Sequence, residues 1–134
     1  MLKRGSQRAF IAAIMVAAGI CVAHAADPNW KRGRIYYRMI CTTCHVAQTG
    51  QAISPSEKTI AEWQVYIKAD QHAAAGSANS SVRYYVSREY RESVKDTNRA
   101  AEKFLRVPEE ELMTDLGAFL VHGAKDSDTP ARCR

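Results

Sequence analysis

Apolar residues recur at spacings of three and four along most of the chain after residue 26, which is the pattern of helices with one buried face. The pattern predicts helices over segments 30–45, 56–68, 82–104 and 109–122. In the second segment Ile60, Trp63 and Ile67 share one face. The third has apolar residues at positions 82, 86, 90 and 94 and is expected to break near 96–98, giving one helix or two.

The last of these segments has clear signals at both ends. Pro108 precedes three glutamates, which lie in the first turn where acidic side chains interact favourably with the helix dipole, and Gly123 suits the end. Its apolar positions are Leu112, Leu116, Phe119 and Leu120.

The first segment is predicted to start at Asp27 and Pro28, an N-cap followed by a proline that fits the first helical turn. Gly33 and Tyr37 lie eight and four residues before Cys41, so the three fall on one helical face. A glycine on that face permits close approach of another helix. The first and last helices are therefore predicted to cross.

Residues 1–25 differ in composition from the rest. A basic head with Lys3, Arg4 and Arg8 precedes an apolar run at 10–22 and the sequence Ala-His-Ala, which is the layout of a secretory signal peptide. The run is shorter than the roughly 20 apolar residues that span a bilayer. We expect cleavage before Ala26, export to the periplasm, a single domain at 26–134 and no stable membrane span.

The charge of the chain changes with this cleavage. The formal net charge is +5, and 46% of the residues are hydrophobic, an ordinary fraction for a globular protein. Removing the three basic leader residues leaves 16 basic against 14 acidic residues. This small excess gives little support to nucleic-acid binding, and no nucleic-acid partner is expected.

The stretch CTTCH, residues 41–45, brings two thiols and an imidazole together. A structural zinc site needs four ligands and normally a second cysteine or histidine pair, which does not follow. A thioredoxin-like redox pair is expected in βαβ surroundings, which the helical pattern does not supply. The remaining interpretation is attachment of one covalent haem c through Cys41 and Cys44, with His45 as the proximal iron ligand. Cys133 is then left without a partner in the mature chain.

With these features the sequence resembles a class I cytochrome c, the family of small soluble proteins with one haem. In that family a glycine and an aromatic residue precede the C-x-x-C-H motif by eight and four residues, as Gly33 and Tyr37 do, and an aromatic of the last helix packs on the first, as Phe119 would. The resemblance covers the two end helices well and the middle poorly. It implies an all-α fold in which these helices cross around one haem with an exposed edge.

The sixth iron ligand departs from the family pattern. Family members usually supply a methionine from a loop before the last helix, but Met39 and Met113 both fall within predicted helices. We predict that His72, which follows the 56–68 helix, replaces it and gives a bis-histidine iron. The alternatives are a solvent-facing His72, a role for His122 or Met113, and an open site. His122 is expected to interact with the helix C-terminus, and Met113 to lie in the core.

These features favour an electron carrier rather than an enzyme, exchanging single electrons with redox protein partners. The alternatives are a haem protein whose open sixth site binds gas or peroxide, and a haem subunit of a larger oxidoreductase. The residues Tyr84, Tyr85 and Tyr90 are expected to form an aromatic wall. A basic face would steer acidic partners, or would simply be solvated; its members are Lys31, Arg32, Arg34 and Arg38.

Overall fold

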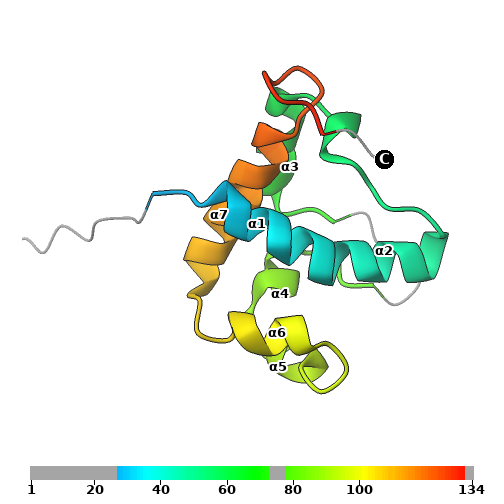
Figure 1. Cartoon of the computed structure of the whole chain (residues 1–134), viewed down its shortest axis with the longest axis vertical. Helices are drawn as coiled ribbons and strands as arrows, with labels where there is room; N and C mark the ends of the chain where they lie inside the picture. Colours follow the sequence, from blue (N-terminus) through cyan, green and yellow to red (C-terminus); the bar gives the residue numbers. More distant parts are fainter. Residues whose placement is uncertain (1–26, 73–77, 132–134) are drawn as a thin grey trace, which may run out of the picture.

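The computed structural model describes residues 27–72 and 78–131, and within these ranges the regular structure is entirely helical (Figure 1). The prediction of an all-α fold is therefore confirmed. The elements are α1 (Trp30–Tyr36), the π-helical turn η1 (Tyr37–Cys41), α2 (Thr42–Thr49), the 3-10 turn η2 (Pro55–Glu57), α3 (Ile60–Ala69), α4 (Val82–Val86), α5 (Arg88–Val94), α6 (Arg99–Phe104) and α7 (Glu109–His122).

Two predictions concern residues outside these ranges. The signal peptide at 1–25 and Cys133 both lie beyond the described residues. Within them, every helix is too short or too polar to cross a membrane.

Helix α1 crosses α7 in close contact, as the sequence predicted (Figure 1). A Cβ atom at Gly33 would lie only 2.5 Å from the carbonyl carbon of Asp115 in α7, so the glycine is needed for this approach. Farther along, the rings of Tyr37 and Phe119 pack with their centroids 5.3 Å apart. The two aromatic residues selected from the sequence therefore meet at the crossing.

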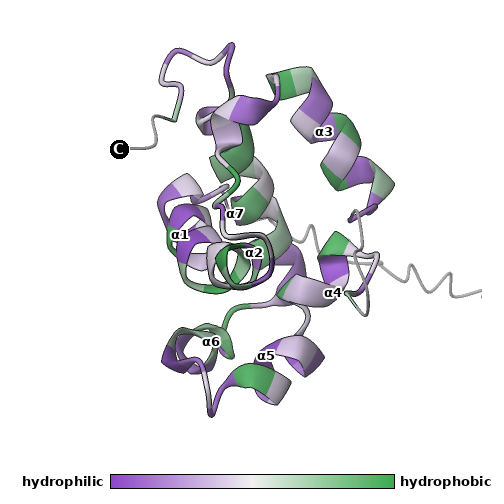
Figure 2. Cartoon of the chain, turned by 90° about the vertical axis from the view of Figure 1, so that its right-hand side faces the viewer, coloured by the Kyte–Doolittle hydropathy of each residue, from purple (hydrophilic) through white to green (hydrophobic). Residues whose placement is uncertain are grey.

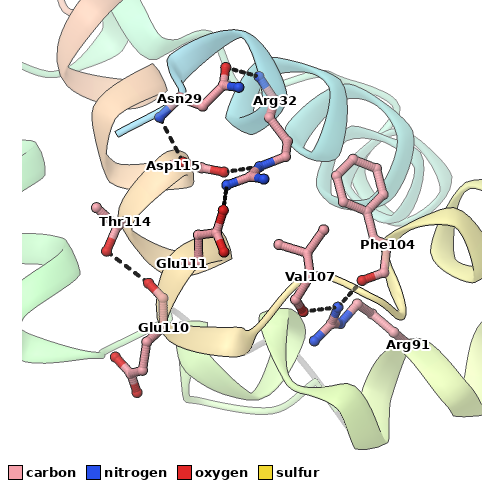
Figure 3. A network of polar contacts seen from close by, with 9 residues as sticks. All are labelled: Asn29, Arg32, Arg91, Phe104, Val107, Glu110, Glu111, Thr114 and Asp115. Carbon is pink, nitrogen blue, oxygen red and sulfur yellow. Dashed lines mark hydrogen bonds and ion pairs between the residues drawn. The ribbon is translucent and has the colours of Figure 1, made fainter. Parts of the chain in front are cut away.

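A buried carboxylate holds the start of α1 on α7 (Figure 3). Asp115 has a relative exposure of 1% and accepts hydrogen bonds from the Asn29 backbone N–H, at 2.7 Å, and from the Arg32 guanidinium. Arg32 also pairs with Glu111. Arg32 is thus part of an intramolecular ion pair, which reduces its contribution to the basic face predicted from the sequence.

The start of α1 also differs from the prediction. The N-cap is Asn29, whose side chain accepts a hydrogen bond from the Arg32 N–H at 3.0 Å, rather than Asp27. Asn29 is favoured because its own backbone N–H is bound by Asp115, which fixes the chain at that residue.

The helices share one hydrophobic core. Figure 2 shows hydrophobic and hydrophilic bands side by side on most of them, as expected where each helix turns one face inward. The two end helices contribute Tyr36, Ile40, Leu112, Met113, Leu116, Phe119 and Leu120, and the middle helices contribute Trp63, Val82, Val86, Ala100, Ala101 and Phe104. Met113 is buried there, as predicted.

The predicted helix at 56–68 is two elements. Pro55–Glu57 forms a 3-10 turn and α3 begins only at Ile60, because Ser54 and Thr59 each start a separate capping box. The chain is extended at Lys58 between the two.

The predicted segment at 82–104 breaks near residues 95–98, as expected, and once more at Ser87. Ser87 has an extended backbone and its side chain accepts from the Tyr90 N–H, so it ends α4 and caps α5. In α5 the buried Arg91 donates to the carbonyl oxygens of Phe104 and Val107, which holds α5 against the end of α6 (Figure 3).

Candidate haem-binding cavity

A cavity of about 580 Å³ opens beside α2 and is lined by all four residues that the sequence selected as haem or iron contacts. Cys41, Cys44 and His45 reach it from the first helical run and His72 from the segment after α3. The remaining wall is mainly aromatic and aliphatic, and includes Tyr37, Ile40, Trp63, Tyr66, Val82, Tyr85, Tyr90, Leu116 and Leu120. A volume of several hundred cubic ångströms with a mostly apolar wall is typical of cofactor sites.

The CTTCH motif lies on an uninterrupted helical run from residue 30 to residue 49. The π-helical turn that ends at the first cysteine of the motif is closed by the Thr42 N–H, which donates to the carbonyl of Tyr37, five residues earlier. Turns of this kind are often found at functional sites. Beyond the turn, residues three and four apart lie on one helical face, so Cys44 and His45 point to the same side as Cys41.

The two cysteines are free thiols in this structure. Burial raises the pKa of Cys41 to about 12, with a further contribution from the nearby Cys44. A thiol with such a pKa is a weak nucleophile near neutral pH, whereas the attacking thiols of redox pairs have lowered values and commonly lie at helix N-termini. The environment of Cys41 therefore disfavours the redox-pair interpretation of the motif.

His72 faces His45 across the cavity. Their ring centroids are 5.7 Å apart and the rings are inclined by 58°. Burial lowers the pKa of His72, and the neighbouring His45 lowers it further, against a smaller opposing effect of the Asn79 backbone. Both effects favour the neutral imidazole, which is the form that binds a metal.

The ring of His72 has an unmet hydrogen-bonding requirement. Its Nδ1 atom is buried and has no hydrogen-bond partner of acceptable geometry among the described residues. Leaving such an atom unpaired costs about 1–3 kcal/mol, so a partner beyond the described residues is expected for it.

The residues present fit a haem. His45 and His72, whose ring centroids are 5.7 Å apart in the same cavity, would both hold the iron. The thiols lie on the same helical face as His45, and the aromatic wall suits a flat apolar macrocycle.

The other candidate ligands lie elsewhere. His122 stacks on Trp30 with ring centroids 3.9 Å apart, and its ring contacts the Thr129 hydroxyl. Met113 is in the core, and Met39 is 48% exposed in η1. Of these four candidates, His72 alone lines the cavity.

Two of the three tyrosines that were expected to form an aromatic wall line the cavity. Tyr85 and Tyr90 both line the cavity, with ring centroids 5.0 Å apart, and Tyr84 packs on both. Sequence reasoning did not select Tyr66, which also lines it and whose pKa is raised to about 12 by burial. Tyr66 follows Trp63 by three residues on α3, so helical spacing from that buried residue is the signal that could have found it.

Within residues 27–72 and 78–131, no group of three or more His, Cys, Asp or Glu side chains is arranged to hold a metal ion. Comparisons of the chain with protein-family models, with curated proteins and with solved structures found no match. Fold and cavity together define a small all-helical domain in which the first and last helices pack closely and a C-x-x-C-H motif faces an apolar cavity.

Proposed function

We propose that this chain is an exported c-type cytochrome with a class I-like fold, which carries single electrons between redox proteins of the periplasm. Cys41 and Cys44 would hold one haem covalently, and His45 and His72 would bind its iron. The observation that carries the proposal is the placement of His72 opposite His45 in the cavity that both cysteines line.

Each group has a distinct part in this function. When bound, the haem supplies a centre that exchanges one electron at a time. The two thiols would retain it in a domain whose core is small, and two imidazoles would keep the coordination similar in both redox states. The apolar wall, with Trp63 and Leu116 among its residues, limits access of water to the centre. Histidine in place of methionine would lower the reduction potential, since methionine ligation raises it.

Covalent attachment is tested by expressing the full chain, with its leader, in a bacterial host that has a haem-attachment system. The purified protein is denatured, separated on a gel and stained for haem. We expect the stain to stay with the polypeptide, and to be lost in the double variant Cys41→Ala/Cys44→Ala.

The matched control is Cys133→Ala, which removes a cysteine that the proposal leaves out of the site. This variant should keep its haem. A wild-type protein that folds but carries no stain, or a double variant that retains it, would overturn the proposal.

A further inference from the structure

The chain on either side of His72 is held together by one carboxylate. Asp70 ends α3 and accepts two hydrogen bonds from the start of α4, both at 2.7 Å: Oδ2 from the Ser81 hydroxyl and Oδ1 from the Arg83 backbone N–H. Asp70 therefore joins the end of one helix to the beginning of the next, and His72 lies two residues beyond it.

The same region holds His72 directly. Its backbone N–H donates to the carbonyl oxygen of Ser80 at 2.6 Å, next to the serine that binds Asp70. Its ring packs on Tyr85 with centroids 5.1 Å apart, and the Tyr85 hydroxyl accepts from the Asn79 N–H at 2.7 Å. The contacts of Asp70 and those of His72 thus share the short segment that precedes and begins α4.

Asp70 has a backbone conformation that is uncommon in residues other than glycine. Its φ of 50° and ψ of 34° are left-handed, and among the described residues other than glycine it alone has a positive φ. Aspartate adopts this conformation more readily than most residues other than glycine, and here it ends α3 so that the carboxylate reaches the start of α4.

We propose that Asp70 is a positioning residue for His72, which keeps the imidazole at the iron by joining α3 to the start of α4. This inference rests on the proposed function, because it takes His72 as the sixth ligand. Loss of the carboxylate should free the segment and let His72 leave the iron more often.

The test is carbon monoxide binding to the reduced holoprotein, since carbon monoxide can bind only after His72 leaves. Asp70→Gly removes both hydrogen bonds and tolerates the positive φ. We expect carbon monoxide to bind at least about tenfold faster than in wild type, which corresponds to the loss of one hydrogen bond to a charged group. Asp70→Asn keeps an acceptor and should show a smaller increase. Ser81→Ala removes one of the two bonds and should also give an intermediate rate.

The matched control lies at the other end of the same helix. Glu62 caps the start of α3 by accepting from the backbone N–H and the hydroxyl of Thr59, at 2.7 and 3.0 Å. Glu62→Gln weakens α3 at a distance from His72 and should leave the carbon monoxide rate unchanged. An equal acceleration in Glu62→Gln would mean that any loss of helix stability has this effect, and would overturn the inference.

The two proposals fail in different ways. Wild type that resists carbon monoxide, together with Asp70 variants that resist it equally, would overturn the positioning role and leave the ligand assignment intact. Wild type that binds carbon monoxide at once, or has no haem, would overturn the ligand assignment itself, and the positioning role with it. If Asp70→Gly does not fold, the rates of Asp70→Asn and Ser81→Ala decide the question.

Discussion

Replacing Gly33 with alanine tests the helix contact that places the CTTCH run beside the cavity. The new Cβ would lie 2.5 Å from the carbonyl carbon of Asp115, closer still to its oxygen, and 3.0 Å from the backbone nitrogen of Leu116. Real Cβ atoms essentially never approach other atoms more closely than 3.0 Å. The obstructing atoms belong to the backbone of α7 and cannot rotate away, so α1 and α7 would have to move apart.

The expected cost follows from three effects. Forcing an extra carbon into a packed contact typically costs about 1–3 kcal/mol. Separation also stretches the bonds from Asn29 and Arg32 to the buried Asp115, and complete loss of a partner from a buried charged pair costs about 3–5 kcal/mol. Alanine regains up to about 1 kcal/mol through its higher helix propensity. We therefore expect the free energy of unfolding to fall by about 2–4 kcal/mol.

The assay is urea unfolding of Gly33→Ala beside Gly117→Ala in α7. A Cβ at Gly117 would meet only a side-chain carbon of Ile67, at 3.9 Å, so this control should be unchanged or more stable by up to about 1 kcal/mol. If Gly33→Ala unfolds within about 0.5 kcal/mol of wild type, the close crossing of α1 and α7 is wrong.

Three further predictions concern charge. Asp115→Asn removes the buried carboxylate and leaves Glu111 as the ion-pair partner of Arg32, so it should lower the free energy of unfolding in urea by about 2 kcal/mol; an unchanged midpoint would contradict the role of this pair. The pKa of Asp70 is lowered in the folded state, so the unfolded state binds more protons in acid. The contribution of Asp70 to the free energy of unfolding should be complete above about pH 4 and lost as the pH falls further. Acid unfolding of Asp70→Asn should therefore depend less on pH. Electron transfer to an acidic redox protein should slow steeply with rising salt. The rate should fall less steeply after Lys31, Arg34 and Arg38 are changed to glutamine, because these three form no ion pair among the described residues. A rate that does not depend on salt would remove the steering role.

The helices at the two ends of the chain could be predicted well because their signals are local. Gly33, Tyr37 and Phe119 mark the crossing by residue type and spacing alone, and Gly123 marks the end of α7. The break at Ser87 was missed because apolar residues continue every four positions across it, and a serine that caps a helix does not interrupt that period. The π-helical turn was missed for a similar reason, since a spacing of four between Tyr37 and Cys41 is read as an ordinary helix.

The candidate site shows the same division between local and distant contacts. Cys41, Cys44 and His45 form a contiguous motif, and His72 was selected because it follows a helix. Asp70 was not selected, because its partners Ser81 and Arg83 lie eleven and thirteen residues away and are brought near only by the fold. The pairing of Arg32 with Asp115, eighty-three residues apart, was hidden in the same way, so the sequence grouped Arg32 with the other basic residues of the first helix.

The most direct test of the central claim is the absorption spectrum of the purified, chemically reduced protein, recorded before and after addition of carbon monoxide. The account predicts the bands of a covalently held haem, and a spectrum that carbon monoxide does not change promptly because His45 and His72 would both hold the iron. Absence of haem bands would contradict the interpretation of CTTCH. A prompt shift would contradict bis-histidine ligation and favour a site that binds gas or peroxide.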